Sequence, residues 1–263
     1  MARIILASKS PRRFELLSMT GLSFEVITSH VDEDAVEASV LAKYRNEAIR
    51  ADMYQIAEDV ACAQARAKAE AVLKSVSPAG SEDSSASATA GSEAAEPDSG
   101  AEGAAPGSNS DIIVIGSDTV VVTEDEILGK PRDEADARRM LTKLSGRTHR
   151  VYTGVAILKK CAGENSVPTN SRSSKDGFDA FDGAGTQSRV FSAFADVKFH
   201  SLDELQEQEI ERYIAGGSPM DKAGAYGIQD EGALLIDSIS GDYYAVVGLP
   251  IAQVNRELQT LLR

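Results

Sequence analysis

The segment 75–110 sets the strongest limit on how this chain can fold. It is built mainly from Ser, Ala, Gly, Glu and Pro, and it contains no Lys, Arg, Leu, Ile or aromatic residue. Such a segment cannot bury enough apolar surface to offset the entropy lost on ordering. The segment 162–188 has a similar composition. We therefore expect one domain over residues 1–263, with disordered insertions at 75–110 and 162–188 and a folded part of about 200 residues.

The charge balance limits the ligands that this chain can bind. Asp and Glu outnumber Lys and Arg by 41 to 27, which gives a net charge of −14. Broad binding to nucleic acid or to an anionic membrane needs a field of positive charge, so we expect neither. Any anionic ligand has to be held by a local cluster of cations.

The N-terminal apolar run and the cysteines indicate a soluble cytoplasmic protein. Residues 4–7 are too short for the apolar part of a signal peptide, and no run approaches the length of a membrane span. Cys62 and Cys161 have no CxxC neighbour and no adjacent histidine. We therefore expect free thiols in a reducing compartment rather than a disulfide framework or a structural zinc site.

Apolar runs alternate with amphipathic segments along the remaining chain. We expect strands at 4–7, 24–28, 112–115, 120–122, 152–158, 191–199, 233–236 and 243–247. We expect helices at 12–19, within 41–74 with the last one over 60–73, at 133–144, from 201–204 to 213, and from 251 to 262. Interleaved strands and helices favour an α/β layered fold with a mixed sheet flanked by helices.

Helix ends follow from a few residues. Ser10 is the expected N-cap of the first helix, with Pro11 at the first helical position. Residues 201–204 read as a capping box, and Gly146 stops the helix that begins at Asp133.

The first candidate site is the hexapeptide SKSPRR at residues 8–13. It places two hydroxyls and two guanidiniums at the start of a helix, where free N–H groups and the helix dipole favour an anion. This pattern predicts a phosphate site, and the alternative is a surface turn whose arginines face solvent.

Asp118 and Lys130 form the second candidate pair. Asp118 follows an apolar strand and a glycine, where a carboxylate can act as a general base or magnesium ligand. Lys130 lies on a loop constrained by Gly129 and Pro131. The alternatives are an aspartate that only caps a turn and a lysine that is only solvated.

The third candidate is the segment 221–229, which has two glycines, a lysine and an amide and neither helical nor strand periodicity. Backbone that approaches a ligand closely has this composition, and an ordinary structural loop is the alternative. The three histidines have no metal-ligand spacing, so we assign them no catalytic role. They are His30, His149 and His200.

Together these segments resemble the Maf-like nucleoside triphosphate pyrophosphatase family. The resemblance covers nearly all of the expected folded chain, with motifs in the same order. The motifs are LASKSPRR (6–13), DED (32–34), AKAEAV (67–72), IGSDTVV (115–121), LGKPRDEADARRML (128–141), LSGRTHRVYTGVAI (144–157), PMDKAGAYGIQ (219–229) and GDYYAVVGLPI (241–251).

The resemblance implies an inosine triphosphatase-like, two-lobed architecture with a central cleft. It also implies hydrolysis of a nucleoside triphosphate between the α- and β-phosphates with a divalent cation, Mg²⁺ or Mn²⁺. Asp118 matches the catalytic carboxylate, which we expect to act with Lys68, and Glu33 and Asp118 match the metal site. The matching substrate-binding positions are Ser8, Arg12, Arg13, Thr119, Lys130, Lys222 and Gln229.

Three of these positions carry the expected substrate preference. Arg12, Thr119 and Gln229 match the residues associated with dTTP and UTP, whereas the branch acting on 7-methyl-GTP typically has Trp, Gln and Glu there. The resemblance also implies a homodimer. Two alternatives stay open: a nucleotide-binding regulator of septum formation that needs no turnover, and a phosphate-binding module of this fold without activity.

Overall fold

The computed structural model describes residues 2–46, 51–77, 110–162 and 186–262. Most of the two expected insertions lies outside the described residues. The parts of these two segments that the structure describes include regular elements. Helix α3 (Met53–Val76) runs past residue 75, and strand β6 (Thr186–Phe199) begins before residue 188. The folded part therefore extends slightly further than the composition suggested.

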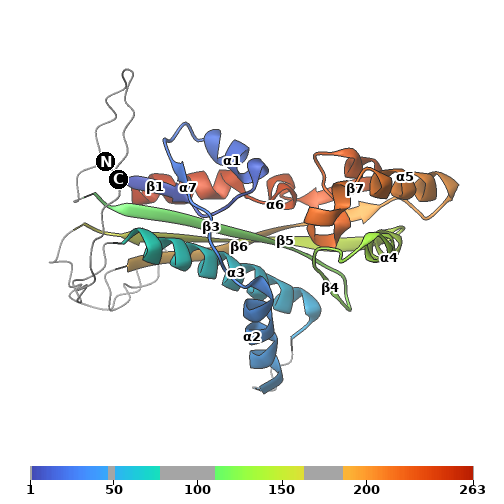
Figure 1. Ribbon diagram of the computed structural model, residues 1–263, viewed down its shortest axis with the longest axis horizontal. Coiled ribbons are helices and arrows are strands. Elements are labelled where there is room, and N and C mark those ends of the chain that lie inside the picture. Colours follow the sequence, from blue (N-terminus) through green and yellow to red (C-terminus); the bar gives the residue numbers. More distant parts are fainter. Residues whose placement is uncertain (1, 47–50, 78–109, 163–185, 263) are drawn as a thin grey trace, which may run out of the picture.

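One seven-stranded mixed sheet organises the chain (Figure 1). Its order is β2-β1-β3-β5-β6-β7, and β4 pairs with β3. The pairs β1·β2 and β1·β3 are parallel, and all other pairs are antiparallel. The remaining strands are β1 (Arg3–Leu6), β2 (Glu25–Val26), β3 (Ile112–Val122), β4 (Ile127–Leu128), β5 (Thr148–Lys160) and β7 (Ile236–Gly241). The expected α/β fold with a mixed sheet is confirmed.

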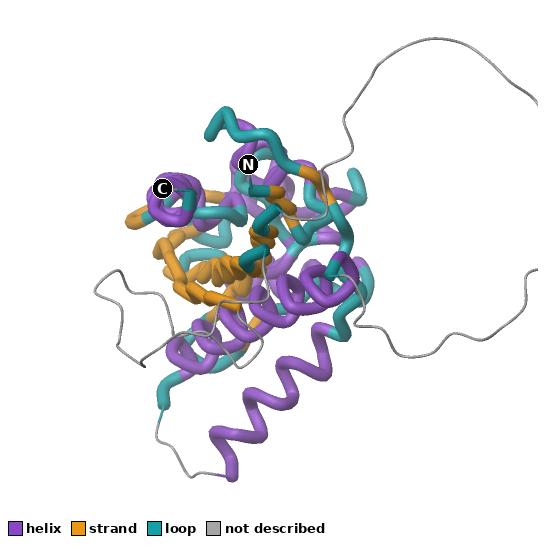
Figure 2. The backbone as a smooth tube through the Cα atoms, turned by 90° about the vertical axis from the view of Figure 1, so that its left-hand side faces the viewer, coloured by secondary structure: helices purple, strands orange, loops and turns teal. Residues whose placement is uncertain are grey.

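Helices cover both faces of this sheet, as the view along it shows (Figure 2). Helix α3 lies on one face and the C-terminal helix α7 on the other, while α4 and α5 pack together at one end (Figure 1). The helices are α1 (Pro11–Ser18), α2 (Glu33–Asn46), α4 (Glu134–Leu144), α5 (Glu204–Ala215), α6 (Tyr243–Val247) and α7 (Ile251–Leu261). Three 3₁₀ turns are η1 (Ser218–Asp221), η2 (Ala223–Ala225) and η3 (Glu231–Leu235).

Two glycines bring α3 unusually close to the centre of the sheet. A Cβ atom on Gly116 of β3 would overlap the backbone at Ala65, and one on Gly154 of β5 would overlap the backbone at Ala61. Small residues on both elements therefore let the helix backbone touch the strands. This contact fixes the height of every α3 side chain above the sheet.

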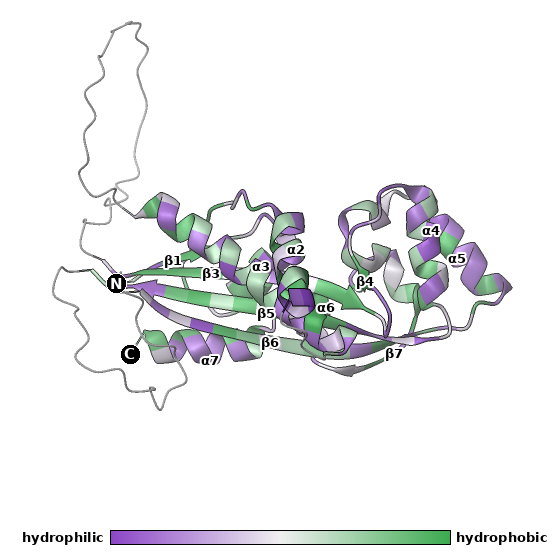
Figure 3. Ribbon diagram, turned by 90° about the horizontal axis from the view of Figure 1, so that it is seen from below, coloured by the Kyte–Doolittle hydropathy of each residue, from purple (hydrophilic) through white to green (hydrophobic). Residues whose placement is uncertain are grey.

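The apolar core divides along the length of the sheet. Where α1 and α7 cover the sheet, Leu6, Ile115 and Val254 share one cluster. At the end with α4 and α5, Leu144, Phe199 and other residues form a separate cluster, and we call this end the distal lobe. β3 and β5 are largely apolar in Figure 3, because helices bury both of their faces. Two further clusters lie between α3 and the sheet, and the two-lobed architecture with a central cleft stays a prediction.

The sequence pattern was wrong about residues 112–122. It predicted two strands, at 112–115 and 120–122, on either side of a polar cluster, but the structure has one continuous strand, β3. Every residue from Ile112 to Val122 has a partner on β5. Pairing with this long neighbour keeps the polar residues extended, which the local sequence does not reveal.

Several helix predictions also need correction. Residues 243–247 form helix α6 rather than a strand, because Asp242 accepts a hydrogen bond from Tyr244 N–H and caps it. Residues 233–236 lie mainly in η3. Helix α2 begins at Glu33, well before residue 41, and α3 begins at Met53 rather than at residue 60. Asp203, not Ser201, caps α5 through Gln206 N–H.

Candidate active site

A short stretch of β3 lacks a strand partner on one edge, within the described residues. Strand β1 pairs with β3 only as far as Ile115, and β4 pairs with it only from Val121. We call residues 116–120 the open edge. The Ile115 carbonyl accepts a hydrogen bond from Ala7 N–H, so the backbone groups of every second residue, Ser117 and Thr119, point toward the same side. Among the described strands, the backbone groups of Ser117 and Thr119 are therefore left without a strand partner on this edge.

Asp118 of the open edge meets Lys68 of α3. Lys68 Nζ lies 2.5 Å from Asp118 Oδ1, and both residues are buried. The same ammonium lies 2.7 Å from Glu33 Oε1 at the start of α2. The contact of α3 with Gly116 and Gly154 sets this geometry, since it holds Lys68 directly over β3. The structure thus brings the two predicted catalytic residues together.

Glu33 also binds Lys130 from the loop after β4. Lys130 Nζ lies 3.2 Å from Glu33 Oε2, and the lysine is exposed. Burial acts to raise the pKa of Glu33, but the hydrogen bonds and charges of Lys68 and Lys130 outweigh it and lower the pKa to about 2. Glu33 is therefore a carboxylate at neutral pH. Four of the predicted site residues form this acidic and basic cluster.

A second cluster surrounds the Arg13 guanidinium. Its Nε donates to the Gly248 carbonyl at 2.9 Å, Nη1 to Ser8 Oγ at 3.4 Å, and Nη2 to Thr119 Oγ1 at 3.1 Å. The predicted cap is confirmed, because Ser10 accepts from Arg13 N–H and Pro11 is at the first helical position. This local structure turns α1 so that Arg13 reaches back to the open edge.

The two clusters belong to one site because their charges interact. Burial lowers the pKa of Arg13, whereas the charges of Asp118 and Glu33 raise it and that of Arg12 lowers it. Asp118 and Thr119 are neighbours on β3, so their side chains leave the strand on opposite faces. The site therefore wraps around the open edge, with Lys68 on one face and Arg13 on the other.

Three predicted residues lie apart from these clusters. Lys222 is buried and binds Asp221 at 2.8 Å and Asp230 at 3.2 Å, so its charge is already neutralised. Gln229 is exposed in a turn. The charge of Arg12 lowers the pKa of Arg13, and after the hydrogen bond from Lys222 it also lowers that of Asp221, so Arg12 is within electrostatic range of both residues. Among the described residues, no hydrogen bond or ion pair joins Lys222 or Gln229 to Asp118.

The sequence interpretation missed several residues of the site. Burial, and then the charges of Asp34 and Asp118, raise the pKa of Glu37, so this carboxylate lies within electrostatic range of Asp118. Its spacing of four residues from Glu33 on one helix is the signal that could have revealed it. Ser117 donates to the carbonyls of Gly154 and Gly248, and Thr153 binds Thr119. These hydroxyls give no local signal, because their partners are far away in the sequence.

The side chains around Lys68 suit a hard divalent cation. Asp118 Oδ1 and Glu33 Oε1 both contact the Lys68 ammonium, so the two carboxylates lie close together, and Mg²⁺ is commonly held by one or two carboxylates together with substrate phosphates. Within the described residues no group of three or more His, Cys, Asp or Glu side chains has the geometry of a metal site. Two neighbouring carboxylates are the ligand set of an ion that is shared with a phosphate rather than of a closed protein cage.

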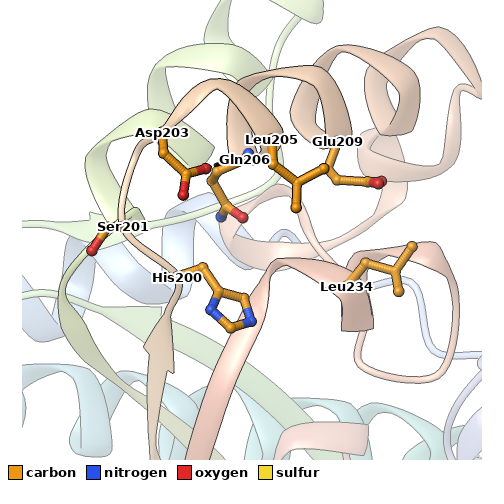
Figure 4. Close-up of a pocket in the computed structure, with 7 residues that line it drawn as sticks. All are labelled: His200, Ser201, Asp203, Leu205, Gln206, Glu209 and Leu234. Carbon is orange, nitrogen blue, oxygen red and sulfur yellow. Dashed lines mark hydrogen bonds between the residues drawn. The ribbon is translucent and has the colours of Figure 1, made fainter.

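A surface pocket lies elsewhere, in the distal lobe (Figure 4). It is lined by His200, Ser201, Leu234 and residues from the first turns of α5. Gln206 uses its amide to bind Ser145 Oγ and the Leu235 carbonyl. The lining contains neither Lys nor Arg, so the pocket does not offer a triphosphate the countercharge found at the open edge.

The comparison with protein families covers almost the whole chain. A family model described as Maf-like protein matches residues 3–261, which include every residue of both clusters. The chain belongs to the Maf-like family. Curated relatives of this Maf-like chain include proteins from Bacillus thuringiensis subsp. konkukian (strain 97-27) and Bacillus cereus (strain ZK / E33L). Each is 37% identical over 98% of this chain and 95% of the relative, and each is named dTTP/UTP pyrophosphatase.

Among the described residues of this Maf-like chain, no helix is both long enough and apolar enough to span a membrane.

Proposed function

We propose that this chain hydrolyses dTTP and UTP to the nucleoside monophosphate and pyrophosphate. The observation that carries the proposal is the buried Lys68–Asp118 pair on the open edge, with the Arg13 guanidinium on the other face of the same strand. The curated relatives named dTTP/UTP pyrophosphatase support the substrate.

Asp118 takes the role of the base that accepts a proton from the attacking water. Its Oδ1 binds Lys68, and no protein group in the described part of the chain bonds to Oδ2. Lys68 therefore fixes the orientation of the carboxylate, and Oδ2 is the oxygen that would accept a hydrogen bond from a water molecule. A base that is oriented before the substrate arrives lowers the cost of reaching the transition state.

Arg13 and Lys130 supply countercharge to the triphosphate. Three of the five N–H groups of Arg13 bond within the described protein, which leaves one on Nη1 and one on Nη2 for phosphate oxygens. The exposed Lys130 can exchange Glu33 for a phosphate. In reactions of phosphate anhydrides the protein mostly positions groups and neutralises charge.

Mg²⁺ or Mn²⁺ is part of the proposal. When bound, the ion would be held by Asp118 and Glu33 and would add positive charge next to the phosphates. Pyrimidine preference is assigned to Arg12, Thr119 and Gln229, and Gln229 carries an amide that can both donate to and accept from a base edge. Homodimerisation and a cytoplasmic location stay predictions.

The test is release of pyrophosphate and orthophosphate from dTTP, UTP, CTP, ATP, GTP and 7-methyl-GTP with Mg²⁺ or Mn²⁺. We expect pyrophosphate from dTTP and UTP with the wild type and a loss of about a thousandfold in Asp118→Asn. The control is Asp237→Asn, which removes an exposed carboxylate on β7 that pairs with Lys198.

Two results would contradict the proposal. Orthophosphate as the product would place the reaction at the terminal phosphate, and release from 7-methyl-GTP in preference to dTTP would overturn the assigned specificity. Tight nucleotide binding without any turnover would instead support a regulatory binding protein.

A further inference from the structure

Thr153 is a buried threonine of β5 to which the proposed function gives no role. It lies directly opposite Thr119 in the register of β3 and β5, and none of it is exposed. The two hydroxyl oxygens are 2.9 Å apart. A cross-strand pair of threonines can share a hydrogen bond in this way.

The direction of that hydrogen bond follows from the next partner. Thr153 Oγ1 lies 2.6 Å from the carbonyl oxygen of Ala245, near the end of the short helix α6. A carbonyl oxygen only accepts, so Thr153 donates its single hydroxyl proton to the Ala245 carbonyl. Thr119 must therefore donate to Thr153, and its oxygen accepts a hydrogen bond from Arg13 Nη2 at 3.1 Å.

The result is a directed chain of hydrogen bonds from Arg13 through Thr119 and Thr153 to Ala245. All of its protons are assigned, because each hydroxyl donates once and the guanidinium only donates. The far end is fixed to a backbone carbonyl at the end of a helix, where carbonyls lack helical partners. A second anchor, the Gly248 carbonyl, holds Arg13 Nε.

Thr119 consequently has no proton left to donate to a substrate. Its hydroxyl therefore does not act as a hydrogen-bond donor to the base, and it contacts the Arg13 guanidinium directly. If Thr153 lost its hydroxyl, the Thr119 proton would have no acceptor across the strands and Thr119 could rotate away from Arg13.

We propose that Thr153 is a positioning residue which, through Thr119, fixes the Arg13 guanidinium in the orientation that binds the substrate phosphates. This inference rests on the proposed function for its kinetic consequence. Its structural part, the control of Arg13 by Thr153, does not depend on any substrate.

The variants are Thr153→Val, Thr153→Ser, Thr119→Val and the double variant Thr119→Val/Thr153→Val. Valine keeps the shape and removes the hydroxyl, whereas serine keeps the hydroxyl. The matched control is Thr123→Val, because Thr123 is also buried and bonds to Asp125 and Glu126 at the other end of β3. Thermal unfolding of each variant reports general loss of stability.

For dTTP hydrolysis we expect Thr153→Val to raise KM about tenfold with a much smaller change in kcat, and Thr153→Ser to restore KM. The KM of the double variant should equal that of Thr119→Val alone, because both substitutions interrupt the same series of hydrogen bonds. A fall in kcat without a change in KM, or additive effects in the double variant, would overturn the proposal.

A substrate-free measurement separates this proposal from the proposed function. In protein with ¹⁵N-labelled arginine, the signal of the Arg13 Nη2–H group that bonds to Thr119 should be sharp in the wild type, Thr153→Ser and Thr123→Val, and broadened in Thr153→Val. If no nucleotide were hydrolysed but the signal behaved in this way, the function would fail and the positioning would stand. An unchanged Arg13 signal in Thr153→Val would refute the positioning, whatever the activity.

Discussion

The Lys68 ammonium and the Asp118 carboxylate lie 2.5 Å apart, with less than a tenth of either residue exposed. Two buried opposite charges stabilise a protein only while both are present, because each compensates for the dehydration of the other. The pair joins the helix α3 to the strand β3, so the stability of the site and its chemistry depend on the same contact.

Replacing Lys68 should therefore destabilise the protein. Lys68→Met leaves Asp118 and Glu33 without their shared cation, and we expect the free energy of unfolding to fall by about 3 kcal/mol. Urea denaturation at pH 7 measures this change. Lys130→Met is the control, because an exposed partner of Glu33 should cost less than about 1 kcal/mol.

The double variant Lys68→Met/Asp118→Asn separates charge from packing. If the loss comes from the unpaired carboxylate, the double variant should be more stable than Lys68→Met by at least about 1 kcal/mol. A double variant that is less stable than the single one would show that lost packing dominates.

Glu33 should make the protein sensitive to acid in a defined range. Its pKa is about 2 in the folded chain and 4.5 as an isolated group. The unfolded chain therefore takes up a proton first as the pH falls, so stability is fully present above pH 4.5 and is lost toward pH 2. In Glu33→Gln the unfolding free energy should decrease less between pH 7 and pH 3. An identical decrease in both proteins would contradict the assignment.

His149 should add a second acid-sensitive range. It is buried, its Nε2 lies 2.8 Å from the Tyr226 hydroxyl, and burial lowers its pKa to about 3 against an opposing effect of Asp196. The depressed pKa means that stability present above pH 6.5 is lost as the pH falls toward 3, by at most about 1.4 kcal/mol per pH unit. Denaturation at several pH values should show a flatter profile in His149→Gln. His200→Gln, at an exposed histidine, should keep the wild-type slope.

The glycine contact under α3 gives a prediction about the backbone. Gly154→Ala forces a Cβ atom into the backbone at Ala61, so it should lower the unfolding free energy by about 3 kcal/mol. Because α3 carries Lys68, nucleotide hydrolysis should fall as well. Gly129→Ala, whose Cβ would meet no atom within 4 Å, should change stability by less than about 0.5 kcal/mol.

The sequence predicted the elements whose signals are local. Ser10 and Pro11 define the start of α1, Asp133 that of α4, and the apolar periodicity from Ile251 defines α7. It failed at residues 243–247, where apolar and aromatic residues indicated a strand but Asp242 caps a helix. A short apolar run is compatible with either structure, and its surroundings decide.

In the candidate site, too, the sequence predicted some features and missed others. By resemblance the chain alone pointed to Asp118, Lys68, Glu33 and Arg13, and the structure brings all four to the open edge. The sequence did not show that Lys222 is already neutralised by Asp221 and Asp230. That contact depends on the packing of turns η1 and η2 in the distal lobe.

The sequence by itself determined which residue types this chain has available: an acidic chain with a few concentrated cations, an α/β succession of elements, and the motifs of one family. Only the tertiary structure decided which of these groups contact one another. For example, β3 stays extended through its polar residues because every residue of β3 pairs with β5. The hydrogen bonds from Arg13 to Thr119, Thr153 and Ala245 join residues that are distant along the chain. Such contacts form only when a sheet brings separate segments together, so no local pattern records them.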